Sequence, residues 1–152
     1  MLRTLLKRLR NQRAFSLVEL LVTIVILSII AAIALPAYLG HQKKSKDSEA
    51  QSNVRNLSSR VELCFATQES YEACDTNEEL GSDPGLPYGS SPGEVRIVEA
   101  TQATYKITGV SRAESDGSKH TFTIEHTGAG TNERTCTAGT TNKNGSCKNG
   151  KW

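Results

Sequence analysis

The first pattern along the chain is an apolar run of twenty-five residues, 15–39, in which Glu19 is the only charged side chain. A helix of that length is about 37 Å long, enough to cross the hydrocarbon core of a bilayer. Inserting a carboxylate in such a segment costs about 2.5–3.5 kcal/mol of free energy at the bilayer centre and less near the surface. The presence of Glu19 therefore indicates a specific structural or functional role. Ser16 and Glu19 also have the spacing of a capping box, which is the purely structural interpretation of this carboxylate.

The chain turns polar after Tyr38 without losing the helical period. Apolar residues recur at steps of four, three, four and four, and no Gly or Pro lies between Gly40 and position 66. We predict one helix over 15–66, whose second half, 40–66, packs on a head domain; a coiled coil is the alternative for that half. The apolar stripe comprises Ala50, Val54, Leu57, Val61 and Phe65, and the solvated remainder includes Lys43, Lys44, Lys46, Asp47, Glu49 and Arg55.

The remaining residues, 67–152, are predicted to form the head. Apolar and polar residues alternate in three segments, 94–100, 104–111 and 119–126, which is typical of an antiparallel sheet with one covered face. The dipeptide Asp116-Gly117 marks the turn between the last two strands. The predicted fold class is therefore α+β, with a long N-terminal helix packed against a small three-stranded antiparallel sheet.

Turn-forming residues dominate the rest of the head. Thr76 and Glu79 have capping-box spacing for one short turn, and Gly and Pro mark a surface loop over 81–93. The tail over 128–152 is rich in Gly, Thr, Asn and Ser, and only a disulfide would order it. Trp152 either packs back on the sheet, the commoner case, or is an adhesive aromatic on the surface.

The charge distribution predicts the orientation of the apolar segment. Five basic residues and no acid lie in the first fourteen positions, which holds this end in the cytoplasm and sends the head outward. Without them the chain has 13 basic and 16 acidic residues, a formal charge of −3, so its net charge does not predict direct binding of nucleic acid. The apolar run is too long for an ordinary secretory signal, whereas a plain uncleaved anchor remains an alternative.

Four cysteines in an outward-facing segment favour two disulfides. Three pairings are possible, and the short loops favour Cys64 with Cys74 and Cys136 with Cys147. No metal site is predicted, because neither spacing resembles a structural zinc motif and His41, His120 and His126 show no matching arrangement. The acids near the first cysteine pair, Asp75, Glu78, Glu79 and Asp83, also lack the alternation of a calcium loop.

The N-terminal motif resembles the processing site of a type IV prepilin. It combines a basic leader, a small residue at Ala14, Phe15, then Ser-Leu-Val-Glu-Leu-Leu running into the apolar helix, with Pro36 further along. The resemblance covers about the first fifty residues closely and the remainder in outline. It departs from the family pattern before the cut, where Ala14 stands in place of the usual Gly. The tail between Cys136 and Cys147 resembles the disulfide-bounded C-terminal loop of pilins.

The resemblance implies a role for each residue of the motif. The leader, residues 1–14, would be removed between Ala14 and Phe15, and the new amine of Phe15 would be N-methylated. Glu19 of an incoming subunit would meet the Phe15 amine of its neighbour in a growing filament, because burying one charge alone is costly. The family also implies that the helix loses order between about Ser28 and Pro36 in assembled filaments, since Pro lacks the N–H for a helical bond.

The sequence therefore predicts a structural pilin subunit that polymerises through its helix, in a filament that supports adhesion, motility or DNA uptake. The expected partners are identical subunits, a prepilin peptidase and methyltransferase, an inner-membrane assembly platform, and membrane lipid before assembly. The protein is expected first in the cytoplasmic membrane and then in an extracellular filament. No catalytic motif or cofactor is predicted. The alternatives are a type II secretion pseudopilin and a single-span envelope binding module that does not polymerise.

Overall fold

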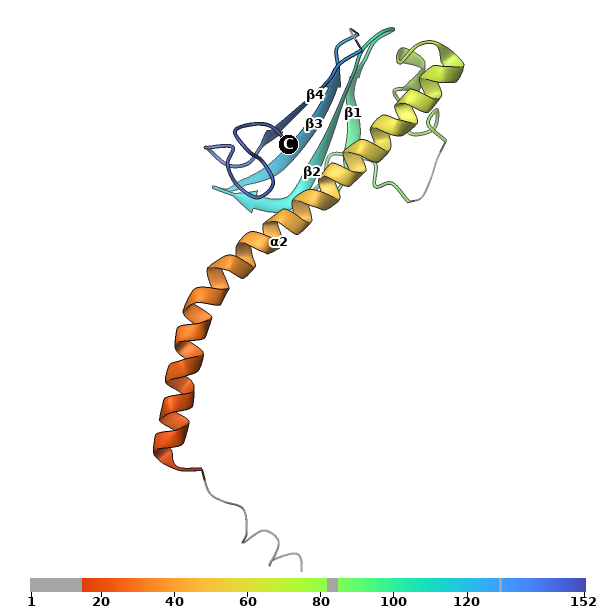
Figure 1. Ribbon diagram of the computed structural model, residues 1–152. Helices are drawn as coiled ribbons and strands as arrows, with labels where there is room; N and C mark the ends of the chain where they lie inside the picture. Colours follow the sequence, from red (N-terminus) through yellow and green to blue (C-terminus); the bar gives the residue numbers. More distant parts are fainter. Residues whose placement is uncertain (1–14, 82–84, 129) are drawn as a thin grey trace, which may run out of the picture. The chain divides into compact units, whose positions relative to one another are not determined.

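A computed structural model describes residues 15–81, 85–128 and 130–152. The elements are helix α2 (Leu17–Gln68), the short 3-10 helix η1 (Glu72–Cys74), and strands β1 (Val95–Ala100), β2 (Tyr105–Ser115), β3 (Ser118–His126) and β4 (Asn132–Thr137) (Figure 1). The chain divides into two units, one ending at Tyr38 and the other, the head, comprising Leu39–Trp152. The predicted α+β fold is confirmed, and α2 begins and ends within two residues of its predicted bounds.

The sheet of the head is antiparallel, with its four strands in sequence order. Three strands were predicted, and the structure corrects this number to four because β4 forms an edge strand within the predicted C-terminal loop. Most β4 side chains are exposed, so its sequence lacks the alternation that marks a half-buried strand. Pairing with β3 and the disulfide at Cys136 hold β4 in place instead.

The hairpin between β2 and β3 turns at the predicted dipeptide. Ser115 pairs with Ser118, and the two residues between them, Asp116 and Gly117, both have positive φ, 53° and 73°. A two-residue type I′ turn requires this conformation at both positions, and Asp-Gly favours it. The dipeptide thus fixes the pairing next to the turn, and the register then shifts once, between Val110 and Glu114.

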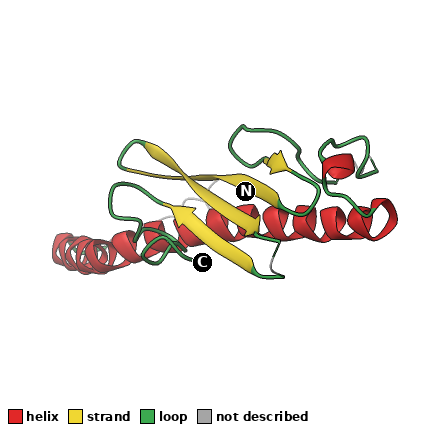
Figure 2. Cartoon of the chain, turned by 90° about the horizontal axis from the view of Figure 1, so that it is seen from above, coloured by secondary structure: helices red, strands yellow, loops and turns green. Residues whose placement is uncertain are grey.

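The core of the head lies between the sheet and the second half of α2, which the strands cross (Figure 2). Four of the five predicted stripe residues are fully buried, and Phe65 packs at their margin. A Cβ at Gly109 of β2 would lie 2.6 Å from Cγ2 of Val54, so glycine allows the close approach of strand and helix. The helix contributes Ala50, Val54, Leu57 and Val61, and the sheet contributes Tyr105, Ile107, Phe122 and Ile124.

Candidate functional site

The N-terminal part of α2 exposes its apolar side chains on every side. An 18-residue window of this helix has a mean hydropathy of 2.8 and none of it is buried, and the helix is long enough to cross a membrane. Phe15 is 78% exposed, and the large apolar residues that follow it, up to Leu39, are at least 47% exposed. A surface of this kind is unstable in water, so it must be covered by lipid or by other protein.

The motif residues lie at the start of this helix. Ser16 directly precedes α2, its carbonyl accepts the N–H of Leu20 at 3.1 Å, and Glu19 lies in the first turn. The free N–H groups of a helix start favour a carboxylate at this place. Phe15 also lies within the described residues, whereas Ala14, the other residue of the predicted processing site, lies outside them. The roles of Ala14, Phe15 and Glu19 in processing and assembly stay predictions.

Helix α2 continues through Pro36, so the segment from Ser28 to Pro36 is helical in the free chain. The Ser28 hydroxyl donates to the carbonyl of Ile24 at 2.7 Å, within its own helix. The carbonyl that faces the Pro36 ring cannot receive an N–H from it, which makes this turn weaker than its neighbours. Melting of this segment on assembly stays a prediction.

Both disulfides join the cysteines that the short loops favoured. Cys64, near the end of α2, is bonded to Cys74 in η1, and Cys136 in β4 is bonded to Cys147 in the C-terminal loop. Cys74, Cys136 and Cys147 are buried. The first bond attaches the segment after α2 to the helix, and the second holds the C-terminal loop to the edge of the sheet.

Cys136→Ser is expected to lower the free energy of unfolding of the head by about 2–3 kcal/mol, because a loop of this size would no longer be closed in the unfolded chain. Denaturant unfolding of the detergent-solubilised protein, followed by Trp152 fluorescence, measures this loss. Adding Cys147→Ser should cost little more, since the bond is already absent. An unchanged unfolding midpoint in the first variant would contradict a stabilising bond.

A buried polar cluster connects α2, the sheet and the C-terminal loop. The side chains of Asp47, Ser111 and His120 are fully buried. The Asp47 carboxylate accepts hydrogen bonds from the Ser111 hydroxyl at 2.8 Å, from Nδ1 of His120 at 3.0 Å and from the backbone N–H of Ser146 at 2.8 Å. A Cβ at Gly145, where φ is +61°, would lie 1.9 Å from Oδ2 of Asp47, so only glycine lets the loop close on the carboxylate.

The cluster extends from His120 towards the surface. Nε2 of His120 lies 2.8 Å from Oγ of Ser115, and the Lys43 ammonium donates to the same oxygen at 3.1 Å. With His120 neutral and protonated on Nδ1, each group donates to the next. Lys43 donates to Ser115, the Ser115 hydroxyl donates to Nε2 of His120, and Nδ1–H of His120 donates to Asp47. Among the described residues no buried side-chain polar atom lacks a partner, so the cluster is fully satisfied.

The order of these bonds is that of a hydrolase triad, but burial prevents that function. His120 and Asp47 are fully buried and Ser115 is 6% exposed, so a substrate cannot reach the hydroxyl. The cluster therefore positions three parts of the head. Within the described residues no group of three or more His, Cys, Asp or Glu side chains is arranged to hold a metal ion.

Sequence reasoning placed Asp47 on the solvated face of the helix, and this was wrong. The signal was present, because Asp47 precedes Ala50 by three positions and Val54 by seven, which places it on the buried stripe. Likewise Ser111 and Ser115 continue the inward alternation of β2, and His120 continues that of β3. A charged residue in phase with an apolar stripe indicates a buried partner, which hydropathy alone does not reveal.

A second polar group lies near the end of α2. The Glu62 carboxylate accepts hydrogen bonds from the hydroxyls of Tyr71, at 3.0 Å, and Tyr105, at 2.8 Å, and the hydroxyls of Ser58 and Tyr105 are 2.9 Å apart. Burial, followed by the hydrogen bond to Glu62 and its charge, raises the pKa of Tyr71 to about 12. Burial is also the main cause that raises the pKa of Tyr105.

The raised pKa of Tyr71 predicts how the head responds to alkali. The fold favours the neutral phenol, so this contribution is complete below the ordinary pKa of 10.0 and is lost as the pH rises through about 12. The free energy of unfolding is therefore expected to fall between pH 10 and 12, and less steeply in Tyr71→Phe. Denaturant unfolding at several pH values in this interval measures both slopes, and equal slopes would contradict the assignment.

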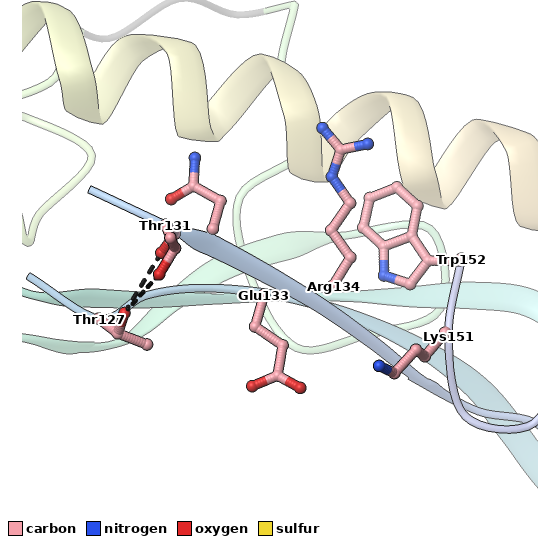
Figure 3. Close-up of a pocket in the computed structure, with 7 residues that line it drawn as sticks. Thr127, Thr131, Glu133, Arg134, Lys151 and Trp152 are labelled. Atoms are coloured by element: carbon pink, nitrogen blue, oxygen red, sulfur yellow. Dashed lines mark hydrogen bonds between the residues drawn. The ribbon is translucent and has the colours of Figure 1, made fainter. Parts of the chain in front are cut away.

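Trp152 packs back on the sheet at one side of a shallow pocket. Its Nε1 donates to the carbonyl of Thr123 at 3.2 Å, and its ring lies edge-on to Phe122 with centroids 5.7 Å apart. The guanidinium groups of Arg55 and Arg134 lie 5.0 and 5.5 Å from the ring centroid. Figure 3 shows Arg134 and Trp152 side by side, with Lys151 beyond them along the pocket wall.

The chain is similar to a known family model and to several curated proteins. A family model described as a prokaryotic N-terminal methylation motif matches residues 9–35. The type IV major pilin protein PilA of Myxococcus xanthus is 31% identical over 112 residues, 70% of this chain and 50% of the relative. The prepilin peptidase-dependent protein D of Escherichia coli is 30% identical over 105 residues, 69% of this chain and 66% of the relative.

A type II secretion system core protein G, from Dickeya chrysanthemi, is 35% identical over 54 residues, 36% of this chain and 35% of the relative. The chain thus spans a third to two thirds of the length of these curated relatives. No solved structure matches it significantly.

Together the fold and the motif define a class of protein with one apolar N-terminal helix, long enough to span a membrane, and a small disulfide-bonded α+β head. The methylation motif and the pilin relatives then identify the family. The chain belongs to the type IV pilin family, in which the pseudopilins of type II secretion systems are included.

Proposed function

We propose that the protein is the structural subunit of a type IV pilus filament. The observation that carries this proposal is the exposed apolar part of α2, most of which lies within the methylation motif matched over residues 9–35. Lipid would cover this surface before assembly, and the same segment of other copies would cover it in the filament. Relatives named as major pilins support this choice.

The proposed pathway begins in the cytoplasmic membrane. A prepilin peptidase cuts between Ala14 and Phe15, and a methyltransferase modifies the new amine. An inner-membrane platform then adds the subunit to the filament, where Glu19 pairs with the Phe15 amine of its neighbour and the helix loosens between Ser28 and Pro36. Adhesion, motility or DNA uptake would be activities of the filament.

A second candidate is a pseudopilin, which would form a short filament within a type II secretion system. Two relatives named as type II secretion core protein G favour it. A third candidate is an envelope binding module that stays anchored by its helix and never polymerises. The place where the mature protein accumulates separates all three.

Intact mass and N-terminal sequence of protein sheared from the cell surface test the proposal. We expect a chain that begins with N-methyl-Phe15 and contains two disulfides, in sedimentable filaments. Mature protein found in the envelope only with a secretion machine would favour the pseudopilin. A chain that keeps its leader and stays in the membrane would leave the anchored module.

The position of the cut has its own test. Replacing Ala14 by Trp is expected to abolish cleavage, because a bulky side chain does not fit a tight scissile site, and the intact mass should then include the leader. A matched Asn11→Trp change in the same leader should still give the mature mass. Normal cleavage of the Ala14 variant would mean that the cut lies elsewhere.

A further inference from the structure

Acidic residues gather at the end of the head that follows α2. Between Arg60 and Arg96 the chain contains eight acidic residues and no Lys or Arg. Five of the acids are exposed, and no ion pair is formed by any of them within the described part of the chain. These five residues, here termed the acidic end, are Glu69, Glu72, Asp75, Glu78 and Glu79.

Basic residues gather around the C-terminal loop. The segment 139–152 contains three lysines and no acid. Two of these lysines, with Lys44 of α2 and the Trp152 ring, line a depression of about 380 Å³. The basic end is defined here as Lys44, Lys143, Lys148 and Lys151, all exposed and, among described residues, without an ion pair.

Few acids oppose this basic surface. Glu133 lines the adjoining pocket with Lys151. Asp116 lies near the loop, but the N–H and hydroxyl of Thr140 donate to its carboxylate at 3.0 and 3.1 Å and lower its pKa. The Asp116 carboxylate therefore stays ionised, but the four lysines of the basic end outnumber these two acids.

The two charged ends lie at opposite ends of the same folded unit. The C-terminal loop, in dark blue, lies beside the first turns of the head part of α2, and the segment after α2 lies at its far end (Figure 1). Lys44 and Gln68 mark these places, about 36 Å apart along the helix. This distance is several times the Debye length, which is about 8 Å at physiological salt. The charges of the two ends therefore do not neutralise each other within one molecule.

We propose that the basic end of one head binds the acidic end of another copy of this chain. This inference rests on the proposed filament, because copies held in one membrane by the same helix share one orientation. Because the two ends lie about 36 Å apart along the head part of α2, the basic end of one head reaches the acidic end of a parallel second head only when the two heads are displaced along that part of the helix. Such a head-to-tail contact repeats without closing, as a filament requires, and its charges fix the axial register.

Charge reversal tests the contact. The basic-end variant is Lys143→Glu/Lys148→Glu, and the acidic-end variant is Glu72→Lys/Glu78→Lys. Each is expected to lower the yield of sheared filaments at least fivefold, because like charges would meet. All four changes in one chain should restore the yield to within twofold of wild type, since the contact is then complementary again with opposite polarity.

A control keeps the net charge change of the basic-end variant but places it elsewhere. Arg96→Glu/Lys106→Glu on β1 and β2 should leave the yield within twofold of wild type. Trp152 fluorescence should give the wild-type unfolding midpoint for the variants at the two charged ends, so that loss of folding is distinguished from loss of contact. The control loses the ion pair between Lys106 and Glu125, so a lower midpoint with a normal filament yield is accepted for it.

The outcomes separate the contact from the filament itself. Absence of filaments in the wild type would refute the proposed function. Normal yields in the single-end variants, or no rescue in the combined variant, would overturn the contact and leave the filament proposal standing. The contact is also overturned if the basic-end variant assembles normally but no longer retains a duplex oligonucleotide, since the basic end would then serve a polyanion.

Discussion

Asp47→Ala is expected to lower the free energy of unfolding of the head by about 3–5 kcal/mol, because donors that lose a buried acceptor cost about 1–3 kcal/mol each. Three donors lose their acceptor together: the Ser111 hydroxyl, Nδ1 of His120 and the N–H of Ser146. Ser111 and His120 would then be buried donors without an acceptor, and a buried polar group without a partner is costly. The C-terminal loop would also lose its hydrogen bond to the Asp47 side chain and keep only the weaker one from the Ser146 hydroxyl to the Lys44 carbonyl.

The only tryptophan of the chain, Trp152, follows the loop that this carboxylate holds, so its fluorescence reports the transition directly. Denaturant unfolding of the full chain in detergent gives the free energy. Glu49→Ala is a matched control, because Glu49 lies two residues away in α2 but its ion pair with Arg112 is exposed. We expect the control to lose less than about 1 kcal/mol.

A double-mutant cycle distinguishes the network from simple packing. If the cost arises from orphaned partners, Asp47→Ala/His120→Ala should cost less than the two single changes added together. Additive losses would mean that the two side chains stabilise the head independently, and a loss in Asp47→Ala no larger than in Glu49→Ala would contradict the network itself.

The fold was largely predictable because apolar residues recur with the period of a helix or a strand wherever one face of that element is buried. The stripe from Ala50 to Val61 and the alternation in β2 and β3 identified the helix and the central strands. Asp116-Gly117 identified their hairpin because few other dipeptides adopt two positive φ values. Strand β4 escaped prediction because an edge strand is held by backbone hydrogen bonds, which any polar sequence can form.

The head's polar cluster was not predictable in the same way. Its members are far apart in the sequence, from Lys43 to Ser146, and only the packed fold brings them together. Asp47 was assigned to solvent because it is charged, although its phase on the helix indicated burial. By contrast, the sequence motif at Phe15 and Glu19 is local and was apparent without the fold, and its role in assembly stays a prediction.

Glu19→Ala is expected to lower the yield of filaments at least tenfold while leaving cleavage and membrane insertion intact. In the proposed filament the Glu19 carboxylate neutralises the Phe15 amine of a neighbouring copy within an apolar surrounding. Removing it leaves an uncompensated buried cation, which costs about 3–5 kcal/mol for each contact. A loss of about 1.4 kcal/mol already corresponds to a factor of ten.

The helix start supplies a competing explanation, because any carboxylate in the first turn stabilises α2 by about 0.3–1 kcal/mol. Glu19→Asp keeps that local effect but shortens the reach to a neighbour, whereas Thr23→Ala changes the next turn without touching a charge. If the ion pair governs assembly, the yield of Glu19→Asp should fall well below that of Thr23→Ala. Similar yields for Glu19→Ala and Thr23→Ala would remove the pairing argument, and the exposed apolar surface alone would then have to hold the copies in register.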